Sequence, residues 1–271
     1  MSHPSSRWQV RHGEHVDLAD LATSSTDGAP GDKAKTNEAT AALTVKLADL
    51  QDRLWAEGQR SLLVVLQAMD AGGKDGTVKH VFSGVNPAGV RVASFKVPTE
   101  LERAHDFLWR IHQEVPAHGE VGIFNRSHYE DVLIVRVNEL VPESVWRPRY
   151  GAIRAFEEAL VAGGTTVVKL FLHISKDEQA ERFQARLDDP TKHWKFSAAD
   201  LEVRKRWDDY QEAYADALRE TSTEAAPWFV IPADRKWYRN WAVSSILVDA
   251  LEGLDPQYPP PEPGLDQIHI T

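Results

Sequence analysis

The amino-acid sequence predicts an α/β fold in which a parallel sheet of five strands is flanked by helices. Short apolar runs alternate with amphipathic stretches five times along the chain. Such repeated strand–helix units are typical of parallel sheets. A glycine cluster directly after the first apolar run marks a sharp turn from a buried strand into a helix. With 271 residues, of which 42% are hydrophobic, the chain is long enough for one large domain or two small ones.

The predicted elements follow one another without a convincing linker or internal repeat. Residues 1–35 are rich in Ser, Asp, Gly and Thr, which predicts an extended arm with little regular structure. Apolar residues at helical spacing predict a helix over residues 37–57. Strands are expected at residues 62–66, 90–95, 121–124, 167–174 and 228–231. We therefore predict one domain over residues 36–254, followed by a C-terminal tail over residues 255–271.

Composition excludes several classes of protein. The chain has no cysteine, which excludes a disulfide framework, a thiolate zinc site and a cysteine nucleophile, and suits a reducing cytosol. Apolar runs of about seven residues are far shorter than the roughly 20 that span a bilayer, so we expect a cytoplasmic protein without a membrane partner. A formal net charge of −10 argues against nucleic-acid binding, because that affinity comes from Lys and Arg. A polyanionic ligand would require a local basic patch.

The segment S-L-L-V-V-L-Q-A-M-D-A-G-G-K-D-G-T predicts a phosphate-binding loop at the end of the first strand. Backbone N–H groups of a glycine-rich turn and a positive helix end together bind phosphate. The predicted phosphate-binding residues are Ala71, Gly72, Gly73, Lys74, Asp75, Gly76 and Thr77. The common pattern G-x-x-x-x-G-K-[ST] is incomplete, since Ala68 and Asp75 replace its first glycine and its hydroxyl. A glycine-rich turn without a ligand is the alternative.

Acidic residues inside this loop indicate a metal ion. Asp70 would repel phosphate directly, but Mg²⁺, with Mn²⁺ as the alternative, can lie between a carboxylate and phosphate oxygens. Asp75 is either a catalytic residue or a carboxylate stabilised by the helix dipole.

A second motif, G-I-F-N-R-S-H-Y-E-D-V-L, places polar residues at the carboxyl end of another strand. Ligands bind at this edge of open parallel sheets. Asn125 can position water or a metal without adding charge, and Arg126 suits two-point contact with phosphate oxygens. The alternative is a surface ion pair between Arg126 and Glu130.

A basic segment supplies the required patch. Residues 181–206 hold seven Lys or Arg against five Asp or Glu, and residues 182–206 read as a lid. Arg182 and Arg186 are four positions apart on a predicted helix, so both can close on a transferring phosphoryl group. The side chains assigned to the lid or substrate channel are Lys79, Lys192, Trp194 and Lys195. A merely solvated charged face is the alternative.

Taken together, these motifs resemble the polyphosphate kinase 2 family from about Arg7 to Leu254. The supporting stretches are M-D-A-G-G-K-D-G-T, H-V-F-S-G-V-N-P-A-G-V-R-V, S-F-K-V-P-T, H-D-F-L-W-R, G-I-F-N-R-S-H-Y-E-D-V-L, K-H-W-K-F-S and A-P-W-F-V-I-P-A-D-R-K-W-Y-R-N. The resemblance implies a three-layer P-loop kinase fold, similar to thymidylate kinases, with a five-stranded parallel sheet and a helical lid. It also implies inorganic polyphosphate as phosphoryl donor and adenine nucleotides, with guanine nucleotides as the alternative, as acceptors. A homo-oligomer, dimer or tetramer, is expected.

The resemblance also implies roles for single residues. Asp70 and Lys74 match the acid and lysine of the phosphate loop, with Asp70 as metal ligand. Arg126 matches the arginine of the second motif, and Arg182 and Arg186 match the arginines of the lid.

Two positions depart from the broader family pattern. Asn125 stands where Asp is usual, and Glu130 stands where Asn is common. This form resembles the subgroup called class III, whose members accept nucleoside monophosphates as well as diphosphates. Glu130 is accordingly a candidate second metal ligand that selects the acceptor.

Two other functions fit parts of the pattern. An ATP-dependent nucleoside or nucleotide kinase on the same fold would share the loop, the lid and the arginines. A nucleotide-binding switch without phosphoryl transfer is disfavoured, because it needs no basic lid.

Overall fold

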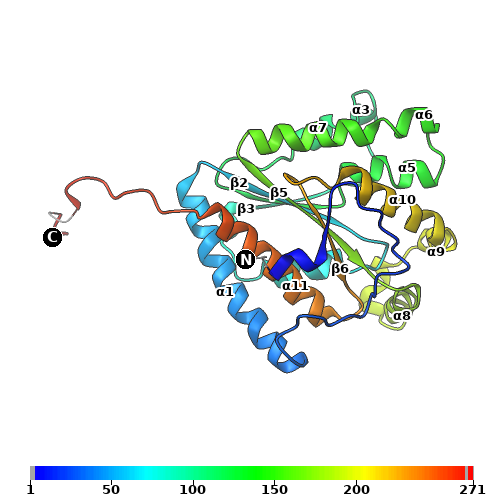
Figure 1. The fold of residues 1–271 in the computed structure, drawn as a ribbon, viewed down its shortest axis with the longest axis horizontal. Helices are drawn as coiled ribbons and strands as arrows, with labels where there is room; N and C mark the ends of the chain where they lie inside the picture. The colour runs from blue at the N-terminus through cyan, green and yellow to red at the C-terminus, as the bar shows by residue number, and fades with distance from the viewer. Residues whose placement is uncertain (1–3, 266–267, 271) are drawn as a thin grey trace.

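A six-stranded sheet lies between two layers of helices in the computed structural model, which describes residues 4–265 and 268–270 (Figure 1). The strands are β1 (Gln9–Val10), β2 (Ser61–Gln67), β3 (Val90–Ser94), β4 (Val121–Asn125), β5 (Thr165–His173) and β6 (Trp228–Pro232). Their order across the sheet is β1-β6-β5-β2-β4-β3. The five strands β2 to β6 run parallel to one another, which confirms the predicted α/β class.

The sixth strand comes from the N-terminal arm and was not predicted. Gln9 and Val10 pair antiparallel with Phe229 and Trp228 of β6. The adjacent Trp8 is buried, and its ring centroid lies 5.5 Å from that of Trp241. The arm has no helix or strand over residues 11–32, so it holds little regular structure, but the sequence did not indicate this strand. A two-residue strand is too short to show a period, and its partner lies more than 200 positions away.

Strand β2 occupies the centre of the sheet and determines where a ligand can bind. All seven residues of β2 are buried, and it pairs with β4 on one side and β5 on the other. The chain first builds the sheet on the β4 side and later on the β5 side, so β2 is the topological switch point. In open α/β sheets, ligands bind at the carboxyl edge of the strands at this point.

Helices cover both faces of the sheet. The long helices α1 (Lys33–Glu57) and α11 (Lys236–Leu254) pack on each other, and α2 (Lys74–Val81) packs against α11 on the same face. The opposite face carries α7 (Arg149–Ala162) and α10 (Trp207–Thr221), which also contact each other (Figure 1). Short helices complete the chain: α3 (Glu100–Arg103), α4 (Trp109–His112), α5 (Ile134–Val137), α6 (Glu143–Trp146), η1 (Pro4–Trp8), η2 (Pro87–Gly89) and η3 (His128–Asp131).

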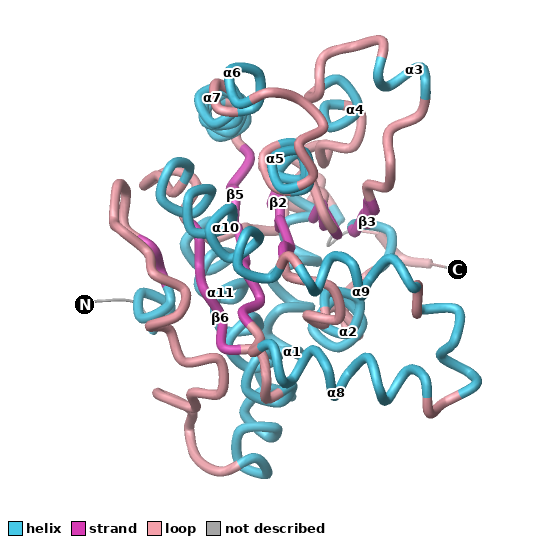
Figure 2. The backbone as a smooth tube through the Cα atoms, turned by 90° about the vertical axis from the view of Figure 1, so that its right-hand side faces the viewer, coloured by secondary structure: helices cyan, strands magenta, loops and turns pink. Residues whose placement is uncertain are grey.

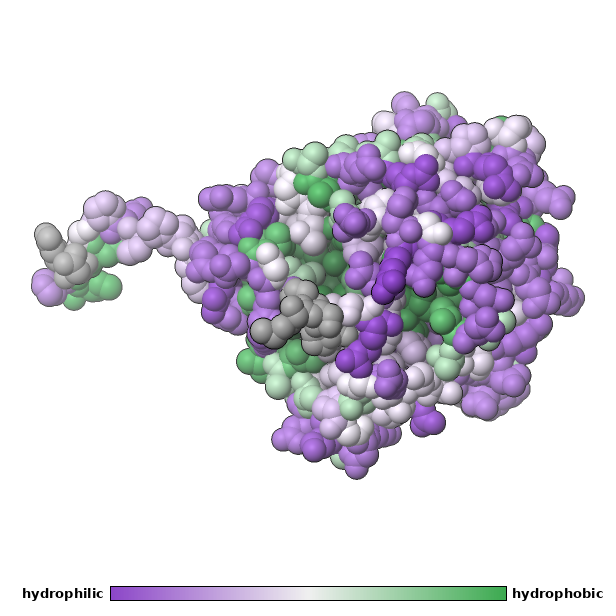
Figure 3. Space-filling view, in the orientation of Figure 1, coloured by the Kyte–Doolittle hydropathy of each residue, from purple (hydrophilic) through white to green (hydrophobic). Residues whose placement is uncertain are grey.

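The predicted lid stands across the carboxyl edge of the sheet. It comprises the second half of α8 (Lys176–Leu187), the turn η4 (Pro190–Lys195) and α9 (Ala198–Lys205). Figure 2 looks at this edge, with α8 and α9 beside α2. Hydrophilic residues cover most of this part of the molecule on the face that Figure 3 shows. None of the helices within residues 4–265 and 268–270 combines the length and the apolar character that crossing a bilayer requires.

Candidate active site

The loop after β2 has the backbone conformation of an anion cradle. Ala71 and Gly73 have positive φ angles of 60° and 100°, and α2 begins at the next residue, Lys74. Gly73 is required here, since a Cβ atom would lie 2.1 Å from Nη1 of Arg239. The Lys74 ammonium folds back along the loop and donates to the Ala68 carbonyl oxygen at 2.8 Å. Burial and the Arg126 charge lower the pKa of Lys74 to about 8, against the opposite effect of Asp70.

Arg126 brings the second motif to this loop. Its φ of 64° turns the chain sharply at the end of β4, and its Nη2 donates to Oδ1 of Asp70 at 2.8 Å. Nη1 lies 4.0 Å from Oε2 of Glu130, so the ion pair with Glu130 exists but is longer than that with Asp70. The Arg126 side chain remains 41% exposed. A guanidinium held this way by Asp70 can still contact phosphate oxygens from the open side.

Asp75 connects the phosphate loop to the second motif and the lid. It accepts a hydrogen bond from Nδ2 of Asn125 at 2.8 Å, and Nζ of Lys195 lies 3.5 Å from its other carboxylate oxygen. Burial alone would raise the pKa of Asp75, but the Asn125 hydrogen bond and the Lys195 charge lower it overall. Asp75, in the first turn of α2, thus contacts both the second motif and the lid.

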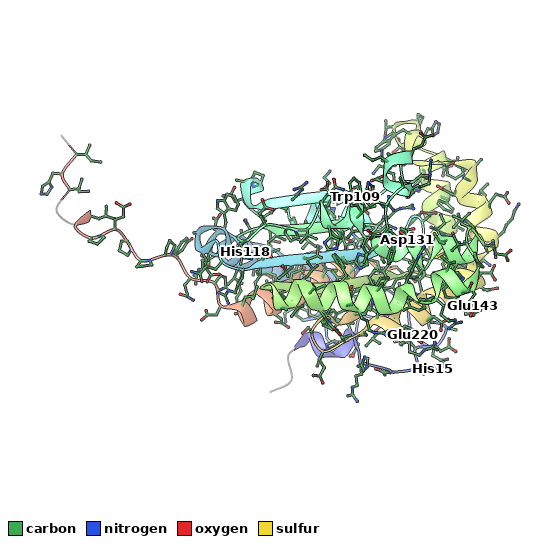
Figure 4. The ribbon with its side chains drawn as sticks, turned by 90° about the horizontal axis from the view of Figure 1, so that it is seen from above. His15, Trp109, His118, Asp131, Glu143 and Glu220 are labelled. Carbon is green, nitrogen blue, oxygen red and sulfur yellow. The ribbon has the colours of Figure 1, made fainter. Side chains whose placement is uncertain are left out.

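A short buried network fixes the position of Glu130. Glu130 belongs to η3, whose neighbouring residue Tyr129 is fully buried. The Gln67 amide satisfies its neighbours when its oxygen accepts from Ser127. In that orientation the Gln67 amide nitrogen donates to Glu130 Oε1 at 3.2 Å. Asp131, which Figure 4 labels, accepts from Nη1 of Arg149 at 3.1 Å and anchors the end of η3. Glu130 is therefore held close to Arg126 on a rigid turn.

The metal site that the sequence predicts would use the carboxylates of Asp70 and Glu130. Asp70 and Glu130 lie on either side of the Arg126 guanidinium. Among residues 4–265 and 268–270, no group of three His, Cys, Asp or Glu side chains could by itself hold a metal ion. Mg²⁺ bound to phosphates needs only one or two carboxylates, since phosphate oxygens and water provide the other ligands.

The two predicted lid arginines have different surroundings. Arg182 is nearly buried, and its donors bind the Ala71 carbonyl at 2.9 Å, the Ala233 carbonyl at 2.6 Å and Glu178 at 2.7 Å. It therefore clamps the phosphate loop to the end of β6. Arg186 lies farther out, where it donates to the Lys195 carbonyl at 2.9 Å and lies 3.8 Å from Asp200.

Replacing Arg186 with Lys is expected to lower turnover about 10-fold or more and to change donor KM less. The substitution preserves the charge but loses the planar fork that binds the lid backbone and would also bind phosphoryl oxygens. Steady-state kinetics would measure both constants. The matched control is Arg206→Lys, which changes an exposed pair with Asp209 at the end of the lid. Equal turnover in Arg186→Lys and the parent would assign Arg186 to a solvated face.

The remaining predicted residues separate into loop and surface positions. Thr77 donates to the Gly73 carbonyl at 3.1 Å and is fully buried, so its hydroxyl stabilises the loop. Lys79 is exposed on α2, and Lys192 pairs with Asp189 at 2.6 Å within η4. Trp194 is 78% exposed, with the Lys195 ammonium 4.9 Å from its ring centroid. Gly72 and Gly76 lie in the loop and in the first turn of α2, as predicted.

Sequence reasoning missed two residues that contact the loop. Gln179 is fully buried on α8 and donates to the Asp70 backbone carbonyl at 2.8 Å. Arg239 on α11 is only 2% exposed and lies against Gly73. A sequence signal existed for Arg239, because this charge stands between aromatic residues in W-Y-R-N-W. No comparable signal marks Gln179.

Known proteins resemble this chain in sequence and in fold. The family model described as "Polyphosphate kinase 2" matches residues 31–259. The chain is 59% identical over 264 residues to "AMP/ADP-polyphosphate phosphotransferase" of Meiothermus ruber, covering 97% of this chain and 99% of that protein. It is 46% identical to "ADP-polyphosphate phosphotransferase" of Rhodopseudomonas palustris, covering 95% and 93%. The crystal structure of Polyphosphate Kinase 2 from Arthrobacter aurescens superposes with a TM-score of 0.92 at 49% identity, covering 96% and 93%.

Proposed function

This chain belongs to the polyphosphate kinase 2 family, and from that premise we propose that it transfers phosphoryl groups from inorganic polyphosphate to AMP and ADP. The observation that carries the proposal is the meeting of Lys74, Arg126 and two carboxylates at the switch point of the sheet. Two cations there can hold phosphate oxygens, while Asp70 and Glu130 can hold a metal ion against them. Relatives with names that specify polyphosphate and AMP or ADP support the choice of donor and acceptor.

Phosphoryl transfer at this site follows from positioning and charge. An oxygen of the acceptor phosphate attacks the terminal phosphorus of the donor, and the bond from that phosphorus to the bridging oxygen breaks. The products are a nucleotide longer by one phosphate and a polyphosphate shorter by one. Lys74 and Arg126 stabilise the charge on the transferring oxygens, and the loop N–H groups hold the donor in line. Mg²⁺ on Asp70 and Glu130 would neutralise phosphate charge when bound.

The direct test is incubation of the protein with AMP, Mg²⁺ and long-chain polyphosphate in the absence of ATP. We expect ADP first and ATP later, separated and quantified by chromatography. A parallel reaction supplies ATP as sole donor. Phosphorylation of the acceptor with ATP but not with polyphosphate would establish the rival nucleotide kinase instead.

Glu130→Asn is expected to impair one acceptor selectively, with AMP affected more than ADP. A monophosphate places its reacting oxygen one phosphate closer to the base than a diphosphate does, so the two acceptors need different metal or phosphate positions. A carboxylate at Glu130 adds such a position, and Asn125 keeps the adjacent site neutral. The kcat/KM values for AMP and ADP measure the effect, with Glu143→Asn on the surface helix α6 as control. Equal loss with both acceptors, or no loss, would contradict the selection role.

The finer assignments belong to the same proposal. We assign Mg²⁺ as the metal ion, with Mn²⁺ as the alternative, and adenine as the preferred base of the acceptor, with guanine as the alternative. We further propose a cytoplasmic location and a homo-oligomer of two or four chains. Residues 36–254 form the proposed phosphotransfer domain, with residues 182–206 as its lid. The match of the family model to residues 31–259 supports these bounds.

A further inference from the structure

Arg239 lies directly behind the phosphate loop. It is the fourth residue of α11 and is 2% exposed. Its Nη1 occupies the space beside Gly73, where a Cβ atom would come within 2.1 Å. Its Nη2 lies 3.6 Å from the place that a Cβ atom would take at Gly76, in the first turn of α2. The guanidinium therefore fits against the two glycines that flank the start of the helix.

This guanidinium has no carboxylate partner within residues 4–265 and 268–270. Its Nε donates to the side-chain oxygen of Asn240 at 3.2 Å, and its Nη2 donates to the same oxygen at 2.8 Å. The Asn240 side chain is neutral. The neighbouring Arg182, by contrast, pairs with Glu178 at 2.7 Å. Burial and the Arg182 charge lower the pKa of Arg239 to about 10, so it stays protonated at neutral pH.

A buried, unpaired cation needs an explanation. Removing a charge from water is costly unless a partner of opposite sign compensates for it. The backbone N–H groups of the same loop, together with Lys74, would hold phosphate. A bound polyanion would therefore supply the missing negative charge, with only the loop backbone between it and Arg239.

We propose that Arg239 is the buried counter-charge for the donor phosphate on the loop, and that it acts through the loop as a positioning residue without touching the donor. The inference rests on the proposed function, because it assigns the anion on the loop to the donor. Across about 6 Å at an effective dielectric constant near 20, one charge can change anion affinity about 10- to 100-fold. Gly73 allows the close approach that this interaction needs.

The experiment compares Arg239→Met and Arg239→Lys with the parent and with Arg235→Met. Arg235 is an exposed arginine at the start of the same helix and serves as the matched control. Binding of tripolyphosphate is measured by calorimetry and by thermal shift without an acceptor. Donor and acceptor KM values are measured separately.

The expected result has two parts. Arg239→Met weakens tripolyphosphate binding and raises donor KM about 10-fold or more, with acceptor KM unchanged, whereas Arg239→Lys retains most of the affinity. Without an anion, Arg239→Met unfolds at the same temperature as the parent or higher, because an unpaired buried charge has been removed. Arg235→Met behaves as the parent.

The opposite pattern would overturn the inference. A packing role predicts a lower unfolding temperature for Arg239→Met with unchanged tripolyphosphate affinity. If Arg239→Met does not fold, Arg239→Gln, which can still bond to Asn240, takes its place, and unchanged affinity in that variant overturns the inference as well. The inference is also overturned if the parent does not bind tripolyphosphate. Tight binding by the parent without transfer to AMP would instead reject the proposed function and leave the role of Arg239 intact.

Discussion

Replacing Lys74 with alanine is expected to lower the rate of phosphoryl transfer on the order of 10³-fold while leaving the fold intact. Lys74 stands at the first position of α2, and its ammonium lies over the loop at the Ala68 carbonyl. Removing it leaves donor charge uncompensated in the transition state. It leaves no large cavity, because the side chain is only partly buried. Single-turnover measurements with saturating polyphosphate would isolate the chemical step.

A matched control is Lys46→Ala, which removes a surface lysine of α1 that pairs with Glu252. Its turnover should equal that of the parent. The pH profile gives a second test of Lys74. The pKa of Lys74 is near 8 in the free protein, so the protonated form, which we propose binds phosphate, is lost as pH rises through that value. The kcat/KM for the donor should therefore fall above about pH 8. A Lys74→Ala variant with near-normal turnover, or a parent profile flat to pH 9, would contradict the assigned role.

Lys169→Met is expected to destabilise the fold by about 3–5 kcal/mol. Lys169 lies in the middle of β5, fully buried, and its Nζ binds Glu157 at 2.6 Å, the Thr221 carbonyl at 2.7 Å and Tyr129 at 3.1 Å. Burial would raise the pKa of Glu157, but Lys169 and His128 keep it lower than usual. Methionine has a similar volume, so the loss comes from a buried carboxylate left without its strongest partner. Denaturant unfolding would measure it.

Two comparisons separate charge from packing in that result. Lys46→Met removes a half-exposed surface pair and should cost no more than about 1 kcal/mol. Adding Glu157→Leu to Lys169→Met should recover part of the loss, since no unpaired charge remains. If the free energy of unfolding of the double variant is lower than that of Lys169→Met by the full cost of a second cavity, packing dominates this site.

The sequence was sufficient to predict that Asp70 and Arg126 meet at the loop. Asp70 and Arg126 each follow a strand of a parallel sheet, and the carboxyl ends of such strands lie at one edge. The alternation of apolar runs defined those strands, so the site followed from local patterns. The predicted helix around Arg182 and Arg186 is also present.

Other features depend on contacts that no local pattern contains. Arg182 and Arg186 lie on one helix, yet the loop carbonyls bind the first and the lid backbone binds the second. Helical spacing predicts a shared face, but long flexible side chains select partners from tertiary surroundings. Lys169 and Glu157 meet because α7 packs on β5, and a lysine inside an apolar strand does not reveal its partner. The placement of Arg239 against Gly73 depends on how α11 packs on α2.

The pairing of β1 with β6 has a consequence for biosynthesis. Trp8 donates from its indole nitrogen to the Tyr238 hydroxyl at 3.2 Å, and these residues are 230 positions apart. At a translation rate of about 5–20 residues per second, roughly 10–50 seconds pass between their emergence from the ribosome. Strand β5 emerges late in that interval, and its edge stays unpaired until β6 emerges; unpaired strand edges favour aggregation. The nascent chain holds its complete phosphate loop long before Arg239 arrives behind it. A chaperone that shields the β5 edge until release of the chain would therefore raise the yield of active protein without altering its final stability.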